Sequence, residues 1–147
     1  MIFAALGGGQ ADVTKEDPIP TVSAVVWFEV YADDVDRAAW FYERAFGWST
    51  RPFTEYDPSG GYLLLSYEAG ARSSGAIVRR PQGESGSSSG WNSVLYIEVE
   101  DVAVAIARVE AAGGTLIEGT RPIGGNDGVF SLVRDSEGNV VGLWSES

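Results

Sequence analysis

The chain has 147 residues, of which 44% are hydrophobic and 21% are charged, and its formal net charge is −11. These values are typical of one globular domain, and the excess of acidic residues disfavours nucleic acid as a partner. The sequence contains no cysteine and no histidine, which excludes disulfides and thiolate nucleophiles and removes the commonest nitrogen ligand of transition metals. No apolar run is long enough to cross a bilayer, so we expect no membrane partner.

Residues 1–20 are predicted to form a flexible tail. The apolar run Met1–Leu6 has no basic flank and stops at three glycines, so it is not a signal peptide. Residues 10–20 have no apolar period and end in Pro-Ile-Pro, which is typical of an irregular segment. We therefore expect a cytoplasmic protein whose residues 21–147 form a single domain.

An internal repeat organises the rest of the chain. A Gly/Ser-rich linker, residues 81–91, separates module one, residues 24–80, from module two, residues 92–145. Each module has a β-rich run, an acidic pair, a helical pattern closed by glycine, and three further β-like runs. Asp34 and Asp101 occupy the same place in the two modules, where each can cap a helix. The predicted unit is βαβββ, used twice, in an α+β protein.

The two helices are predicted from the spacing of their apolar residues. The first runs from Val35 to Phe46 and is closed by Gly47, and the second begins at Val102 and ends at Gly113-Gly114. Aromatic residues of the first helix are predicted to be core or subunit contacts; they are Trp40, Phe41, Tyr42 and Phe46. Because Trp40 and Trp48 flank the apolar stripe, where a partner could cover them, we expect a homodimer.

Alternation along the strands predicts a ligand pocket. Further strands are expected near 48–55, 61–67 and 75–79, and near 114–119, 128–134 and 139–145. In the first strand the apolar set that includes Phe28 should face the helix, while the alternate residues face the other way. The mixed faces of three strands supply the predicted pocket residues: Trp27, Glu29, Tyr31, Val94, Tyr96, Glu98, Gly142 and Trp144. The face of the third strand that carries Tyr62, Leu64 and Ser66 is left undecided.

Several of these segments resemble one known family. They are VVWFEVYADDVDRAAWFYERAFGW, GAIVRRP, YIEVEDVAVAIARVEAAGGT and DSEGNVVGLW. Together they look like the vicinal oxygen chelate superfamily, the glyoxalase, bleomycin-resistance and extradiol-dioxygenase group, and most of all its branch related to lactoylglutathione lyase. The resemblance implies two tandem βαβββ modules that form a cupped, barrel-like mixed sheet with helices on the convex side.

The resemblance also implies a metal site, but residues of a different chemical type stand at its ligand positions in this sequence. Trp27, Val94 and Gly142 stand where the family places ligands, and residues 75–80 contain no carboxylate, histidine or glutamine. We therefore expect no metal and no cofactor.

The two inward-facing glutamates admit two interpretations. Glu29, the better candidate because Trp27 and Tyr31 flank it, could be a catalytic base whose pKa is raised by an aromatic pocket. Alternatively, Glu29 and Glu98 lie near a rim, solvated or paired with an arginine such as Arg79. Arg79 and Arg80 could bind an anion or form a solvated strand end, and the glycine-rich residues 124–128 are predicted to be a turn.

Two functions remain open. The first is metal-independent binding that sequesters a small aromatic or amphipathic molecule, neutral or cationic in preference to anionic, as the bleomycin-resistance members of the fold sequester a drug. The second is a glyoxalase-like lyase or isomerase that uses a carboxylate base.

Overall fold

The computed structural model describes residues 23–68 and 70–147, so the predicted tail at residues 1–20 lies outside the described residues. The chain divides into two compact units. The first unit is Trp27–Leu95, and the second unit is Tyr96–Ser147 together with residues 23–26.

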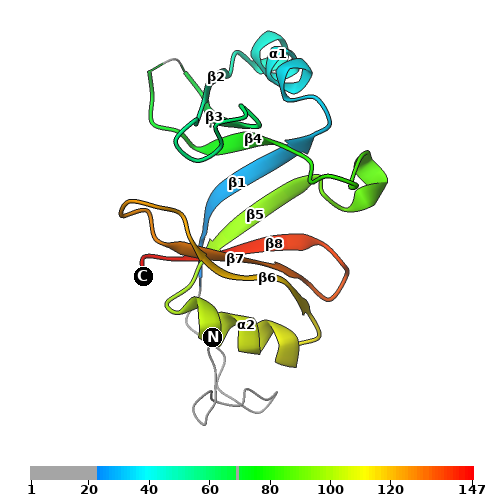
Figure 1. Ribbon diagram of the computed structural model, residues 1–147, viewed down its shortest axis with the longest axis vertical. Helices are drawn as coiled ribbons and strands as arrows, with labels where there is room; N and C mark the ends of the chain where they lie inside the picture. The colour runs from blue at the N-terminus through cyan, green and yellow to red at the C-terminus, as the bar shows by residue number, and fades with distance from the viewer. Residues whose placement is uncertain (1–22, 69) are drawn as a thin grey trace. The chain divides into compact units, whose positions relative to one another are not determined.

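The first unit contains one helix and a mixed sheet. Its elements are β1 (Val25–Ala32, which begins in the second unit), α1 (Val35–Phe46), β2 (Ser49–Pro52), β3 (Tyr62–Ser66) and β4 (Gly75–Arg79). The strand order is β2-β3-β4-β1, in which β1 and β4 are parallel and the other neighbours are antiparallel. Helix α1, drawn in cyan in Figure 1, contacts β4 and β2.

Helix α1 begins and ends where its capping residues require. The Asp34 carboxylate accepts a hydrogen bond of 3.0 Å from the backbone N–H of Arg37, which satisfies one of the free donors of the first turn. Gly47 follows with φ of 73°, and its N–H donates to the carbonyl of Glu43. This left-handed conformation favours glycine and ends the helix.

The core of the first unit lies between α1 and the sheet. Val35, Leu63, Leu65 and Ile77 are buried there, and Phe28, Tyr42 and Trp48 pack against them. Trp48 stacks on Tyr42 with ring centroids 5.1 Å apart. Trp48 is therefore half-buried within its own unit, and its coverage by a partner subunit stays a prediction.

The apolar stripe of α1 is wider than the face that the core covers. Trp40, Phe41 and Phe46 are 63%, 50% and 61% exposed. Their prediction as core residues of this chain is wrong, since α1 already buries Val35 and packs Tyr42 against the sheet. The alternative, that these rings are subunit contacts, stays a prediction.

The second unit repeats the same order of elements. They are β5 (Ser93–Glu98, which begins in the first unit), α2 (Val102–Ala111), β6 (Thr115–Pro122), β7 (Val129–Arg134) and β8 (Val140–Ser145). The strand order is β5-β8-β7-β6, and α2 contacts β6, β7 and β8 (Figure 1). The Asp101 carboxylate accepts from the N–H of Val104 at 3.1 Å, as Asp34 does in α1. The predicted βαβββ repeat is thus confirmed.

The end of α2 differs in detail from the predicted glycine pair. Gly113 has φ of 105°, whereas Gly114 is not in the left-handed region. A Cβ at Gly114 would overlap the Arg134 carbonyl and the Val109 side chain. Gly113 therefore serves the turn, and Gly114 allows the chain to pass close to β7 and α2.

The segment between the modules is more ordered than its composition predicts. It contains a short 3₁₀ helix, η1 (Ser87–Ser89), and hydrogen bonds from Gly86 to Asp33 and from Arg80 to the Trp91 carbonyl hold it. In the described residues no helix is both long and apolar enough to span a membrane.

Candidate ligand-binding site

A buried carboxylate forms the centre of the site in the first unit. Glu29 on β1 is 4% exposed. One of its carboxylate oxygens accepts a hydrogen bond of 2.9 Å from the hydroxyl of Tyr31, and the other accepts one of 2.7 Å from the hydroxyl of Tyr62. The Tyr62 hydroxyl in turn accepts from the indole N–H of Trp27 at 3.2 Å. The structure therefore links four side chains, and the prediction that Glu29 is solvated is wrong.

Strand pairing explains how Tyr62 joins this group. Tyr62 lies opposite Val78, which lies opposite Tyr31, and Leu64 is aligned through Ala76 with Glu29. Residues opposite one another in neighbouring strands point to the same face of a sheet. Tyr62 and Leu64 therefore share the face of Glu29, the choice that alternation within β3 alone left undecided. Tyr62 is the site residue that the sequence did not assign.

Further aromatic rings surround the hydrogen-bonded group. The ring centroid of Tyr62 lies 5.0 Å from that of Tyr56 and 6.1 Å from that of Phe53. Phe53 and Tyr56 belong to the loop between β2 and β3, and Tyr56 is 39% exposed. On the other side, Tyr31 contacts Trp91 with centroids 5.1 Å apart. The first unit thus presents aromatic surface around one buried negative group, with a partly exposed ring at its edge.

The loop that carries Tyr56 is held by its own polar contacts. The carboxylate of Asp57 accepts from both the backbone N–H and the hydroxyl of Ser59, at 2.9 and 2.6 Å. The Ser59 hydroxyl, with smaller contributions from its N–H and from Arg79, holds the pKa of Asp57 below its usual value against the effect of burial. Arg79 donates to the same hydroxyl at 3.3 Å. These contacts fix the loop beside Tyr62.

The second unit carries the other predicted pocket residues, apart from the buried Val94, which lies in the first unit. Tyr96 is 8% exposed and its ring lies 6.3 Å from that of Phe130. It also covers Gly142, since a Cβ built on Gly142 would overlap the Tyr96 ring. The indole N–H of Trp144 donates to the Asp127 carbonyl at 2.7 Å, which ties β8 to the turn at 124–128. Glu98 is exposed.

These residues do not fit the metal centre that the family resemblance implied. At the ligand position held by Trp27, the indole N–H donates a hydrogen bond to the Tyr62 hydroxyl. At the ligand position held by Gly142, the Tyr96 ring fills the space that a side chain would need. Both carboxylate oxygens of Glu29 accept from phenols. Within the described part of the chain, no three side chains of His, Cys, Asp or Glu gather closely enough to hold an ion.

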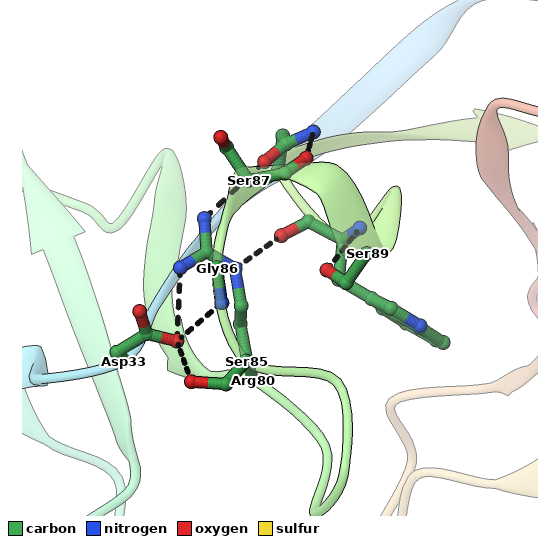
Figure 2. A network of polar contacts seen from close by, with 8 residues as sticks. Asp33, Arg80, Ser85, Gly86, Ser87 and Ser89 are labelled. Atoms are coloured by element: carbon green, nitrogen blue, oxygen red, sulfur yellow. Dashed lines mark hydrogen bonds and ion pairs between the residues drawn. The ribbon is translucent and has the colours of Figure 1, made fainter.

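A polar network holds the segment after β4 against the end of β1 (Figure 2). The Arg80 guanidinium contacts the Asp33 carboxylate at 3.0 Å and donates to the Trp91 carbonyl at 2.8 Å and the Asn92 side chain at 3.2 Å. The same oxygen of Asp33 accepts from the N–H of Gly86 at 3.0 Å and from Ser85 at 3.2 Å. The interpretation of Arg80 as a solvated strand end is therefore wrong.

The charge on Asp33 is stabilised by this network. The hydrogen bond from Gly86, and then those from Arg80 and Ser85, hold the pKa of Asp33 below its usual value. A carboxylate that accepts several hydrogen bonds binds its proton less readily than one in water.

A shallow groove of about 400 Å³ lies beside the start of α1. Its lining includes Tyr31, Asp33, Arg37, Phe41, Tyr42 and Arg80. Among the eight predicted pocket residues, Tyr31 is the one that borders this groove. Its charged residues are of both signs, so the groove shows no preference for a charge.

Comparison with known proteins places the chain in a family. The model of the Glyoxalase/Bleomycin resistance protein/Dioxygenase superfamily matches residues 24–143. The chain belongs to this superfamily. The match covers both βαβββ modules, so the resemblance inferred from the sequence motifs is confirmed.

Curated relatives of this superfamily chain are longer than it is. "Putative glyoxylase CFP32" of Mycobacterium bovis is 31% identical over 123 residues, which cover 80% of this chain and 44% of that protein. "Anthracycline biosynthesis protein DnrV" of Streptomyces peucetius is 28% identical over 132 residues, which cover 82% of this chain and 46% of that protein. The chain thus spans about half the length of these relatives.

Solved structures share the fold at low sequence identity. A hypothetical protein from Bacillus halodurans matches with a TM-score of 0.57 and 14% identity, covering 86% of this chain and 96% of that one. Methylmalonyl-CoA epimerase from Mycobacterium tuberculosis matches with a TM-score of 0.53 and 18% identity, covering 88% of this chain and 93% of that one. The predicted α+β fold class of the superfamily is therefore confirmed.

Proposed function

We propose that this chain is a metal-independent binding module that sequesters a small aromatic or amphipathic molecule without changing it chemically. The observation that carries the proposal is the Glu29 group, in which a buried carboxylate holds two tyrosine hydroxyls inside a set of aromatic rings. Aromatic surface with a few fixed polar groups is typical of small-molecule sites. The pocket residues named from the sequence remain part of this proposal.

The hydrogen bonds of Glu29 favour binding over general base catalysis. A base must reach the proton that it removes through a free lone pair on one of its oxygens. Each carboxylate oxygen of Glu29 accepts a phenol hydrogen bond, at 2.9 and 2.7 Å. Although each oxygen keeps a second lone pair, Glu29 is 4% exposed, so a substrate would have to reach a carboxylate that the fold covers. Orienting the Tyr31 and Tyr62 rings toward a ligand needs no such access.

The charge of the site predicts the class of ligand. Aromatic faces attract cations, by about 0.5–2 kcal/mol per favourable contact, and a nearby carboxylate adds to this preference. We therefore propose a planar ligand that is cationic or neutral. The relative whose name places it in anthracycline biosynthesis is consistent with a planar aromatic ligand.

The charge preference can be tested with three ligands of equal ring size. N-methylacridinium supplies a cation, acridine at pH 8 a neutral ring, and anthracene-9-carboxylate an anion, and calorimetry gives each Kd. We expect the cation to bind most tightly. Trp27→Ala should weaken its binding by roughly two- to thirtyfold. Glu29→Gln should bring the Kd of the cation close to that of acridine, while Leu116→Ala, at a 43% exposed residue of the second unit, is the control and should bind as the wild type does.

Two results would contradict the proposal. One is that anions, including S-hexylglutathione, bind more tightly than the cation and that Trp27→Ala leaves the Kd unchanged. The other is turnover of a glutathione hemithioacetal that Glu29→Gln abolishes, since that outcome supports the glyoxalase-like lyase or isomerase with a carboxylate base.

We also propose that the chain forms a homodimer through α1. Trp40, Phe41 and Phe46 on α1 are exposed aromatic residues of the first unit, as is the 56% exposed Tyr67, and the rings of Phe41 and Phe46 lie 6.1 Å apart. Exposed aromatic patches of this kind mark interaction sites. Light scattering should give twice the chain mass of 15.7 kDa, and Trp40→Glu should halve it. A monomeric wild-type protein would refute this part. Residence in the cytoplasm is a further proposal, to be tested by cell fractionation.

A further inference from the structure

A buried tryptophan stands at the end of the Gly/Ser-rich linker. Trp91 is 7% exposed, although the ten residues before it are mostly glycine, serine and other polar types. Its ring contacts Tyr31, with centroids 5.1 Å apart and planes at 54°. Burial of this ring is stabilising in itself, and it also places the ring against Tyr31, a residue of the candidate site.

The backbone around Trp91 is fixed by one arginine and its partners. Arg80 donates to the Trp91 carbonyl at 2.8 Å and to the Asn92 side chain at 3.2 Å. The Asn92 carbonyl accepts from the N–H of Tyr31 at 2.6 Å, and the Trp91 N–H donates to the Ser89 hydroxyl at 3.2 Å. The side chain of Arg80 is 13% exposed and also contacts Asp33 (Figure 2). The indole of Trp91 is thus placed by several contacts outside its own ring.

Trp91 contacts Tyr31, which is one of the two residues that donate a hydrogen bond to Glu29. A tyrosine side chain turns about two bonds, and a ring packed against one of its sides limits those rotations. Tyr31 must keep one orientation for its hydroxyl to donate to Glu29 at 2.9 Å. The geometry points to Trp91 as a positioning residue: we infer that Trp91, held by Arg80, keeps the Tyr31 hydroxyl on Glu29 and thereby sets the affinity of the ligand site. The linker is then a part of that site.

The effect on affinity rests on the proposed function, so two measurements are needed. The first uses ligand-free protein and follows the ¹³C chemical shift of the Glu29 carboxyl carbon, which responds to the hydrogen bonds that the carboxylate accepts. The second is the Kd of N-methylacridinium. We expect Trp91→Leu to shift the Glu29 signal in the direction that Tyr31→Phe shifts it, and to weaken probe binding by roughly two- to tenfold. Trp91→Phe, which keeps a ring against Tyr31, should restore most of the wild-type Glu29 chemical shift and most of the wild-type affinity.

A double-mutant cycle separates positioning from general destabilisation. If Trp91 acts through Tyr31, adding Trp91→Leu to Tyr31→Phe changes the Kd by less than twofold, because the hydroxyl is already absent. Gln82→Ala, at an exposed linker residue, is the control and should leave both readouts unchanged. Circular dichroism identifies a variant that fails to fold, and Trp91→Phe then supplies the comparison.

The inference is overturned if Trp91→Leu leaves the Glu29 signal at its wild-type position, or if its effect on Kd is undiminished in Tyr31→Phe. Should the wild-type protein fail to bind the probe, the proposed function fails. The Glu29 signal still decides whether Trp91 positions Tyr31.

Discussion

Glu29 is the one charged side chain among the described residues that the fold buries, alongside Ser66, Ser131 and Ser145. A carboxylate withdrawn from water is destabilising unless hydrogen bonds replace its hydration. Tyr31 and Tyr62 supply such bonds, one to each oxygen. The rings that carry these hydroxyls are thereby fixed in orientation, which is the property that a preformed ligand site needs.

Tyr96 and Gly142 show how a side chain can occupy a family's functional position. The ring of Tyr96 fills the space beside Gly142. Gly142→Ala should destabilise the protein by about 1–3 kcal/mol, because the added methyl group overlaps the ring and the packed strand has little room to move. Urea unfolding measures the change in the free energy of unfolding.

Gly119→Ala is the matched control for Gly142→Ala. Gly119 also lies in a strand of the second unit, but a Cβ there would meet no atom within 4 Å, so we expect no loss of stability. If the two alanine variants are equally stable, the contact between Tyr96 and Gly142 is looser than described. Adding Tyr96→Leu to Gly142→Ala should remove part of the penalty.

The two α-helices share a capping device that the sequence repeat already indicated. Asp34 and Asp101 accept from the backbone N–H three residues ahead, at 3.0 and 3.1 Å. We expect Asp34→Ala and Asp101→Ala each to lower the free energy of unfolding by about 1 kcal/mol, the usual effect of removing an N-cap. Thermal or urea unfolding checks this.

The first turn of α1 offers a control for these variants. Asp36 is acidic and lies in that turn, but it is not the cap, so Asp36→Ala removes only a favourable interaction with the helix dipole. Its effect should be smaller than that of Asp34→Ala. Equal losses would mean that negative charge, and not the capping hydrogen bond, stabilises the start of the helix.

The linker network should depend on pH. Hydrogen bonds from Gly86, Arg80 and Ser85 lower the pKa of Asp33 from its ordinary value of 3.8. Because the folded pKa is the lower one, the stabilisation is complete above 3.8 and is lost as the pH falls through the folded value. The amide proton signal of Gly86, followed by NMR, should keep its hydrogen-bonded position down to about that range and then move.

Asp33→Asn tests the origin of that transition. The variant removes the titrating group, so the acid transition of the Gly86 signal should disappear, whereas it should persist in Asp36→Asn. If Gly86 titrates alike in all three proteins, another carboxylate controls the linker.

For the molecule as a whole, the side chains available as metal ligands predict the metal content. The chain lacks histidine and cysteine, and the positions at which the superfamily implied ligands hold Trp27, Val94 and Gly142. We expect no stoichiometric zinc, nickel, manganese or iron in the purified protein, measured by elemental analysis before and after mild chelation. One ion per chain that survives chelation would contradict this, and with it the metal-independent binding that we propose.

Much of this architecture follows from the sequence because its causes are local. The 3.6-residue and two-residue periods placed α1, α2 and the strands, and aspartate and glycine marked the helix ends. The same alternation put Trp27, Glu29 and Tyr31 on one face of β1, since neighbouring side chains of a strand must point to opposite sides. The family motifs then identified the repeat as the superfamily fold.

Contacts between distant residues were decided only by the tertiary structure. Which face of β3 carries Tyr62 depends on its register with β4 and, through β4, with β1. The burial of Trp91, the enclosure of Arg80 and the packing of Tyr96 over Gly142 likewise join segments far apart in the chain. No pattern within one segment contains such a register, because the pairing energy that fixes it arises only when the strands meet.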